Sequence, residues 1–356
     1  MDSAPPTASS FSRRQLLQSG ALTLGASFIS WAGQAQSLQR RGPTLLVQNE
    51  MTSLTFGTNW FAQAEHGGFY QAVARGIYQD HGLQVTIKMG GPQINGTQLL
   101  VGRAIDFFMG SAADAIQAIQ VGLPKITVAA IFQKDPQVLI AHPGTGVESP
   151  ADLTDRPILI SAGAQKTYWP FLKAKFGLSD DQVRPYNFNM GPFLQDKQAV
   201  QQGYLTSEPF SIQKEAGFEP VVLLLADFGY TPYATTIETL QERVQQDPDQ
   251  VQRFVDASIK GWYDYFQDPG PGNQLIKQDN PEMTDDKLAN GLAKMQEYGI
   301  VVSGDAEAQG IGSMNTDRWQ DLFESLVAAG IVEADVDYTQ AFTLQFVNKG
   351  ADYYLS

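Results

Sequence analysis

The sequence contains no cysteine, only three histidines and few basic residues, and each shortage excludes a class of protein. Without cysteine there is no disulfide, thiolate metal site, cysteine nucleophile or lipid attachment at cysteine. The formal net charge of −14 argues against nucleic acid or an anionic membrane as a partner. His66, His81 and His142 form no i, i+4 pair and no cluster of the size that zinc needs. We therefore expect no metal centre and no cofactor.

Motifs of common enzyme classes are missing as well. There is no G-x-S-x-G elbow, no Walker loop and no dinucleotide fingerprint after a strand. The nearest glycine-rich stretch is "MGGPQING" at residues 89–96, whose spacing fits neither phosphate motif, so we interpret it as a turn. These absences favour a binding protein over an enzyme.

The N-terminus predicts an export signal at residues 1–35. Arg13 and Arg14 lie in a polar lead, an apolar region follows from about residue 21 to 32, and a small-x-small cleavage site ends at Ala35. A membrane anchor is the alternative, but the apolar region is too short to cross ~30 Å of hydrocarbon. We expect export by the twin-arginine pathway, cleavage near Ala35 and a soluble periplasmic product.

Alternating strand and helix patterns predict an α/β protein with two lobes. A chain of 356 residues exceeds what one core usually supports. We expect the first part of lobe I at 36–140 and lobe II at 141–229. The return crossover, the rest of lobe I and C-terminal helices then occupy 230–356. Two lobes with mostly parallel sheets, joined by crossover segments near 137–141 and 229–235, describe a hinged clamp with its ligand in the cleft.

Several local patterns give specific expectations. A helix is predicted from His66 to about Asp80, and a breaker-rich loop at 267–274. In lobe II a helix is predicted around "FLQDKQAVQQG" and a strand at "YLTSEP". After "FGYTPYATT" the chain becomes helical, most clearly in "PDQVQRFVDASIKGWYDYFQ". That helix has an apolar face made of Val251, Phe254, Val255, Ile259 and Trp262.

Candidate pocket residues follow from a geometric rule, because ligands of open α/β sheets bind beyond the carboxyl ends of strands. The candidates are Asn59, Trp60, Glu65, His66, Phe69 and Tyr70 near the first strand; Gly110, Ser111 and Ala112 after a later strand; and Glu208 and the weaker candidate Tyr168 in lobe II. Each main site has an alternative. Ser111 could only cap a helix, Trp60 could be a core residue, and Glu208 could be an ordinary first-turn acid.

The charges at these strand ends favour one chemistry of ligand. Glu65 and Glu208 lie there, but no lysine or arginine does. A sulfonate, nitrate or phosphate would need a positive group or a dense set of amide donors. Aromatic planes and carboxylates suit a flat heterocycle with amino groups, because rings stack and carboxylates accept hydrogen bonds from amines.

The stretches "NWFAQAEHGGFYQA", "GIYQDHGLQV", "AIDFFMGSAADAIQAIQVGLP" and "QQGYLTSEP" resemble periplasmic solute-binding proteins related to yeast thiamine pyrimidine synthase and to aliphatic-sulfonate binders. The resemblance covers about residues 53–265 and implies a type II periplasmic-binding-protein fold, with a membrane permease and its ATPase as partners. Asn59, Trp60 and His66 match the N-W-x-P-x-x-x-H pattern of the branch that recognises the thiamine pyrimidine precursor. Ala62 stands where proline is usual.

The resemblance also bears on the enzyme alternative. The synthase uses a lysine that holds pyridoxal phosphate, a histidine that it consumes, and a cysteine-rich segment. The corresponding positions are Ala112 and Ile116, and the chain has no cysteine. We therefore expect a monomeric, non-enzymatic importer component that binds a thiamine-precursor-like pyrimidine or related N-heterocycle. Riboflavin, an aliphatic sulfonate or another nitrogen compound are the alternatives, and a synthase-type enzyme is the last of them.

Overall fold

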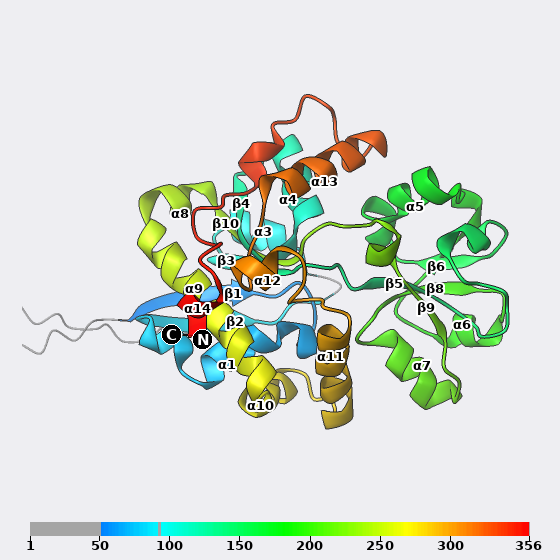
Figure 1. Ribbon diagram of the computed structural model, residues 1–356, viewed down its shortest axis with the longest axis horizontal. Coiled ribbons are helices and arrows are strands. Elements are labelled where there is room, and N and C mark those ends of the chain that lie inside the picture. The colour runs from blue at the N-terminus through cyan, green and yellow to red at the C-terminus, as the bar shows by residue number, and fades with distance from the viewer. Residues whose placement is uncertain (1–50, 92–93, 356) are drawn as a thin grey trace, which may run out of the picture. The chain divides into compact units, whose positions relative to one another are not determined.

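The computed structural model describes residues 51–91 and 94–355, and the predicted export signal at 1–35 lies outside these residues. The described chain forms two five-stranded sheets with helices around them (Figure 1). The strand order is β2-β1-β3-β10-β4 in the first sheet and β7-β6-β8-β5-β9 in the second. Among the described residues, no helix is long and apolar enough to span a membrane.

The first sheet consists of β1 (Thr52–Gly57), β2 (Leu83–Lys88), β3 (Phe107–Ser111), β4 (Lys125–Phe132) and β10 (Ala234–Leu240). The second consists of β5 (Gln137–Ala141), β6 (Ile158–Ile160), β7 (Val183–Pro185), β8 (Val200–Tyr204) and β9 (Val221–Leu224). In each sheet three strands pair in parallel, but β5 and β10 are antiparallel to both of their neighbours. The lobes are therefore mixed sheets, because β5 and β10 each enter from the other sheet instead of following a crossover helix.

The helices of the N-terminal part and of the second sheet are α1 (Gly67–Ala74), α2 (Ile77–Asp80), α3 (Gly96–Val101), α4 (Ala112–Gln120), α5 (Trp169–Phe176), α6 (Gly191–Gln195) and α7 (Glu208–Ala216). Those of the C-terminal part are α8 (Gln241–Gln246), α9 (Pro248–Gln267), α10 (Gly270–Asp279), α11 (Asp285–Glu297), α12 (Asp305–Gln309), α13 (Thr316–Ala328) and α14 (Ala351–Leu355). Short 3-10 turns add to these, and η1 (Ala64–His66) matters most for the site.

The crossover segments differ from their predicted positions. β5 pairs on both sides with strands of the second sheet, so residues 137–141 belong to that sheet and the crossing lies at 133–136. The return crossing lies at 229–233, because β10 begins at Ala234 in the first sheet. The expected boundary between residues 140 and 141 therefore falls too late in the chain.

Two central strands were wrongly predicted. The expected helix around residues 193–203 ends at Gln195, and residues 200–204 form β8. The expected strand at 204–209 instead consists of the last residue of β8, a turn at 205–207 and the first two residues of α7. β10 was missed because its Thr and Glu residues look polar in sequence. All seven of its residues are buried, since the strand lies between β3 and β4. Pairing on both edges decided these two segments over local propensity.

The helical predictions had mixed outcomes. α9 spans the predicted twenty residues, and all five residues of the predicted apolar face are fully buried. Its start is fixed by Asp247, whose carboxylate accepts a hydrogen bond from Gln250 N (3.1 Å). The predicted helix from His66 to Asp80 is instead broken into α1 and α2 at Gly76, where φ is +72°. The predicted loop at 267–274 is largely α10.

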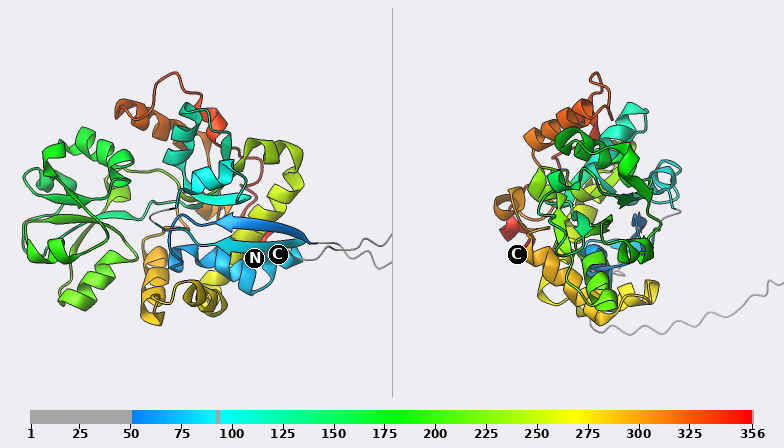
Figure 2. Two further views of the ribbon diagram at one scale, coloured as in Figure 1. Left: turned by 180° about the vertical axis from the view of Figure 1, so that it is seen from behind. Right: turned by 90° about the vertical axis from the view of Figure 1, so that its right-hand side faces the viewer.

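α1 packs closely against α9 (Figure 2). The contact depends on two glycines of the "EHGGFY" stretch. A Cβ at Gly67 would lie 2.1 Å from the Tyr265 ring, and one at Gly68 would lie 2.2 Å from the Trp262 ring. These glycines therefore let α1 approach the aromatic side chains of α9, which fixes the position of the preceding turn η1.

A buried ion pair holds β10 in the first sheet. Lys125 Nζ donates to Glu238 Oε2 at 2.7 Å, and the two side chains are 1% and 0% exposed. Glu238 lies against Gly110 on β3, where an added Cβ would meet the carboxylate at 2.2 Å. The residue type at position 110 is thus explained by this ion pair, which needs a neighbour without a side chain.

Removing one partner should expose how much this pair supports the fold. We expect Lys125→Met to lower the free energy of unfolding by about 3–5 kcal/mol, because Glu238 is left buried without a counter-charge. The double variant Lys125→Met/Glu238→Leu should recover most of the loss. Urea unfolding measures this, with Lys277→Met as control, since its pair with Asp285 is exposed and worth below ~1 kcal/mol. A Lys125→Met loss no larger than the control's would contradict this account.

Candidate functional site

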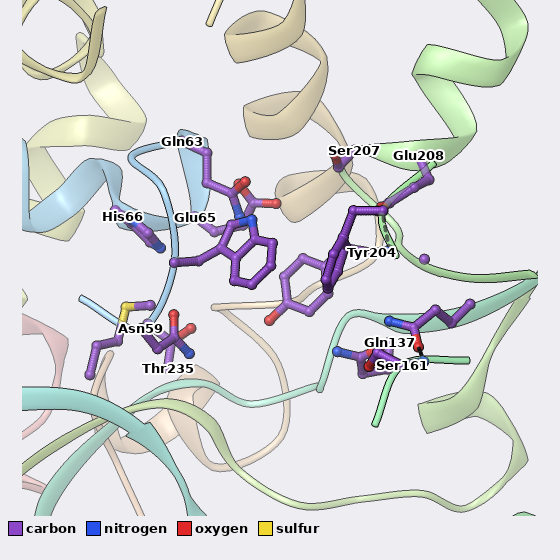
Figure 3. A pocket seen from close by; sticks show the side chains of 15 residues that line it. Asn59, Gln63, Glu65, His66, Gln137, Ser161, Tyr204, Ser207, Glu208 and Thr235 are labelled. Carbon is purple, nitrogen blue, oxygen red and sulfur yellow. Dashed lines mark hydrogen bonds between the residues drawn. The ribbon is translucent and has the colours of Figure 1, made fainter. Parts of the chain in front are cut away.

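A cavity of about 250 Å³ is lined by residues of both sheets' connecting segments (Figure 3). From the first sheet come the loop after β1, η1, Met109 and Thr235. From the second come the starts of β5 and α7, the end of β8, Ser161 and Phe188. The cavity therefore lies where the carboxyl end of β1 meets the turn between β8 and α7.

Two carboxyl groups line the cavity from opposite sides. Glu65 lies in η1, is 3% exposed and accepts a hydrogen bond from the Thr206 hydroxyl. Glu208 is the first residue of α7 and accepts from Tyr204 N at 2.8 Å. Burial raises the pKa of Glu65 to about 7, and burial also raises the pKa of Glu208. Among the described residues, no lysine or arginine contributes to the pKa shift of either group, so burial is not offset by a positive charge.

His66 contributes a neutral imidazole to the same wall. It follows Glu65 in η1, and its side chain is almost fully buried. Burial lowers the pKa of His66 to about 3, so the ring carries no charge near neutral pH. Its Nδ1 has no hydrogen-bond partner among the described residues. The ring is therefore a polar, uncharged group of the site.

Aromatic rings close the cavity from both sheets. Trp60, in the loop after β1, lies 4.8 Å from Phe188 between ring centroids, with the planes at 51°. Phe188 follows β7 and also contacts Tyr186, at 5.3 Å between centroids. Tyr204 at the end of β8 adds a third ring to the lining. Flat apolar surfaces thus face the same space as the two carboxyl groups.

The rest of the lining is polar and uncharged. Four amide side chains contribute, those of Asn59, Gln63, Gln137 and Gln202, and no lysine or arginine is among the lining residues of this cavity. Gln202 is oriented by its own contact, since its Oε1 accepts from Ser161 N. Within residues 51–91 and 94–355, no group of three or more His, Asp or Glu residues could hold a metal ion.

Five predicted residues line this cavity, namely Asn59, Trp60, Glu65, His66 and Glu208. Phe69 and Tyr70 do not, and their prediction as pocket wall is wrong. Phe69 is fully buried between Phe56 and Trp262, at 4.5 and 5.8 Å between centroids. Tyr70 is 2% exposed, and its hydroxyl donates to Asp279 Oδ2 at 2.7 Å. The orientation of α1 about its own axis directs both side chains towards the core and away from the cavity.

The predicted site at the end of β3 also lies outside the cavity lining. Ser111 caps α4, accepting from Asp114 N at 3.2 Å, and Ala112 N donates to Tyr233 O at 3.0 Å. These groups are already used within the protein, and Gly110 packs against Glu238. The crossing before β10 covers this strand end, which the sequence did not reveal.

Tyr168 was expected on the opposite wall but lies in the core of the second sheet, 2% exposed and next to Tyr230. The second sheet's aromatic lining residues are instead Phe188 and Tyr204. Sequence reasoning also missed Gln63, Met109, Gln137, Ser161, Gln202, Gly203, Ser207 and Thr235. Met109, Tyr204 and Ser207 stand close in sequence to predicted candidates, so a wider window at each strand end would have found them.

Comparison with solved structures defines the class of fold. The chain superimposes on the periplasmic aliphatic sulphonate binding protein SsuA of Escherichia coli with a TM-score of 0.61, 13% identity, and coverage of 81% of this chain and 91% of that one. It also resembles the desulfurization enzyme DSZB, with a TM-score of 0.54, 13% identity and coverage of 85% and 99%. The fold is the two-lobe α/β fold of periplasmic binding proteins.

The sequence places the chain within this class. The model of the NMT1/THI5-like family matches residues 63–271, so the chain belongs to that family. A relative in Chloroflexus aurantiacus, the riboflavin-binding protein RibY, is 27% identical over 317 residues, which are 87% of this chain and 90% of the relative.

The raised pKa of Glu65 predicts a pH dependence of stability. Its pKa is about 7 when folded and 4.5 as the ordinary value, so the folded state binds the extra proton between these limits. The contribution to stability is full below pH 4.5 and is lost as the pH rises through 7, by up to about 3 kcal/mol. Glu65→Gln should therefore lose less stability than the wild type between pH 5 and 8.

Urea unfolding of both proteins at several pH values measures this difference. Glu242→Gln is the matched control, because Glu242 is exposed and its ion pair with Arg103 lowers its pKa. Parallel pH profiles for the wild type and Glu65→Gln would show that Glu65 keeps an ordinary pKa in the fold.

Proposed function

We propose that this chain is the exported binding component of an ABC importer and that its cavity binds a planar nitrogen heterocycle. The observation that carries the proposal is the composition of the lining. Trp60, Phe188 and Tyr204 supply aromatic surface, Glu65 and Glu208 supply carboxyl groups, and no lysine or arginine lines the cavity. Family membership and the two-lobe fold support the role as a solute-binding protein.

The electrostatics argue against an anionic ligand. A sulfonate brought between Glu65 and Glu208 would be repelled by either carboxyl group in its ionised form, so the site would have to take up protons to bind it. No cationic side chain of the lining could compensate. A heterocycle with ring N–H or amino groups offers donors to the carboxyl oxygens, and its face stacks on the indole of Trp60.

Two members of this ligand class have separate support. A thiamine-precursor-like pyrimidine fits the Asn59, Trp60 and His66 pattern, and the cavity of about 250 Å³ is smaller than the ~300–1,000 Å³ of pockets for drug-sized molecules. Riboflavin is the second candidate, because the RibY relative carries the riboflavin-binding name. The larger flavin would need the lobes further apart than the structure has them.

Binding without catalysis is part of the proposal. Ala112 and Ile116 occupy the positions where the related synthase has its lysine and histidine, and both side chains are fully buried. Glu65 and His66 are neighbours of the residue types that enzymes use as a catalytic acid and base. However, the lowered pKa of His66 makes it a poor proton acceptor near neutral pH. The cavity therefore favours recognition of a ligand over its conversion.

Calorimetry with four ligands tests the proposed class: formylaminopyrimidine, hydroxymethylpyrimidine, riboflavin and an alkanesulfonate. We expect binding of at least one heterocycle and none of the sulfonate. Trp60→Ala should weaken the heterocycle's affinity by about tenfold or more through lost stacking, and His66→Ala by about tenfold through a lost polar contact. His81→Ala is the control, since His81 Nδ1 contacts Ile77 O outside the cavity.

Sulfonate binding with no heat from any heterocycle would overturn the proposed ligand class. Unchanged affinity in both Trp60→Ala and His66→Ala would remove these residues from the site while leaving the ligand class intact.

Export by the twin-arginine pathway is tested through Arg13 and Arg14. We expect the protein in the periplasm with an N-terminus near residue 36. The double change Arg13→Lys and Arg14→Lys should leave the uncleaved precursor in the cytoplasm, because the pathway recognises the arginine pair. Cell fractionation with mass spectrometry of the N-terminus measures both. A precursor that is still cleaved and exported would indicate another pathway.

A further inference from the structure

Thr235 has an unusual backbone conformation at the point where the chain returns to the first sheet. Its φ is +46°, in the left-handed region, which a β-branched residue seldom adopts. The register of β10 against β3 shifts here, because Ala234 pairs with Ser111 while Thr236 pairs with the next residue, Gly110. Against β4 the same stretch pairs regularly. Thr235 is therefore the extra residue of a β-bulge, a feature that re-aims a side chain.

The hydroxyl of Thr235 is not used within the protein. The residue is 4% exposed and lines the cavity, yet its Oγ1 has no hydrogen-bond partner in the described part of the chain. Nearby threonines of β10 differ, since Thr236 Oγ1 donates to Glu238 Oε1 at 3.2 Å and Thr239 Oγ1 to Asp106 O at 2.8 Å. The hydroxyl is not one of the fully buried polar atoms that lack a partner, so it is open to the cavity, where a ligand can bond it.

A second lining residue shares the unusual conformation. Phe188 has φ of +59°, and its ring meets Trp60 across the cavity. The described residues contain four non-glycine residues with positive φ, and two of them, Phe188 and Thr235, line this one cavity. Backbone strain of this kind persists where the surrounding structure enforces it, and it gathers at ligand sites.

The position of Thr235 assigns it to one edge of the ligand. Figure 3 shows it beside Asn59, on the His66 side of the cavity, with Gln137 and Ser161 on the other side. A hydroxyl can both donate and accept, so it suits a ring oxygen or ring nitrogen. The carboxyl groups accept from the ligand, whereas this hydroxyl and the amide of Asn59 can donate to it.

We propose that Thr235 is a specificity-determining residue, whose hydroxyl hydrogen-bonds a ring oxygen or nitrogen of the bound heterocycle. The inference rests on the proposed function of the cavity. A site built to bond a heteroatom rejects an analogue that lacks it, because the site's own polar group is then left unpaired. The strained bulge holds the hydroxyl at that place before the ligand enters.

Three variants separate this role from a structural one. Thr235→Val keeps the shape and removes the hydroxyl, and it should weaken binding about tenfold. Thr235→Ser should bind within about threefold of the wild type, since the hydroxyl stays. Thr235→Gly accepts positive φ without strain, so its urea midpoint should be equal or higher while its affinity falls about tenfold or more. A merely structural residue would not combine equal stability with weaker binding.

Calorimetry on the mature protein uses the same four ligands. For every ligand that the wild type binds, the affinity of each variant is compared with that of the wild type. Thr239→Val is the matched control from the same strand. Its hydroxyl bonds Asp106 outside the cavity, so it should lose stability and keep affinity. Wild-type affinity in Thr235→Val or Thr235→Gly would overturn the role of Thr235.

A wild type that binds only the sulfonate would refute the heterocycle. The proposed bond from Thr235 to a ring atom would then be overturned as well, whereas an unchanged heterocycle affinity in Thr235→Val overturns that bond alone. A wild type that binds none of the four ligands contradicts both proposals.

Discussion

The insertion of β10 between β3 and β4 is the constraint on which the site depends. The strand is fully buried and carries Glu238, whose carboxylate is paired with Lys125. Its position requires glycine at residue 110 and covers the strand end where the sequence predicts that Ser111 and Ala112 contact a ligand. The bulge at Thr235 then turns one residue of the returning chain into the cavity. The pairing of β10 thus covers the end of β3 and brings Thr235 to the cavity lining.

Both crossings between the sheets are tied to the C-terminal helices. Arg318 of α13 donates to Gln133 O on the first crossing and to Thr231 O on the second, the latter at 3.0 Å. Its guanidinium also lies 3.9 Å from the Tyr233 ring centroid. A bidentate cation on two carbonyls fixes the spacing of these segments. One side chain therefore holds together the two segments that join the sheets.

Contacts between the lobes are also built into the site itself. Glu65 of η1 accepts from Thr206, which precedes α7, and Asn290 of α11 donates to Thr206 O at 3.3 Å. Near this point α11 stands between the first sheet's helices and α7 (Figures 1 and 2), and Lys214 pairs with Asp286 there at 3.1 Å. The same acid that faces the cavity thus takes part in joining the lobes. Burial at this contact raises the pKa of Glu65.

The sequence by itself determined the α/β class, the two lobes, α9 with its buried face, and five of the lining residues around Trp60 and Glu208. These predictions depend on local information: the period of the hydrophobic residues, the helix caps, and the rule that ligands bind beyond the carboxyl ends of strands. Only the tertiary structure decided that Phe69 and Tyr70 face the core, that β5 belongs to the second sheet, and that β8 and β10 are strands. The rotation of a short helix and the pairing of a central strand depend on neighbours far away in the chain. Local sequence therefore cannot fix them, and Phe188 and Thr235 reach the cavity through those long-range contacts alone.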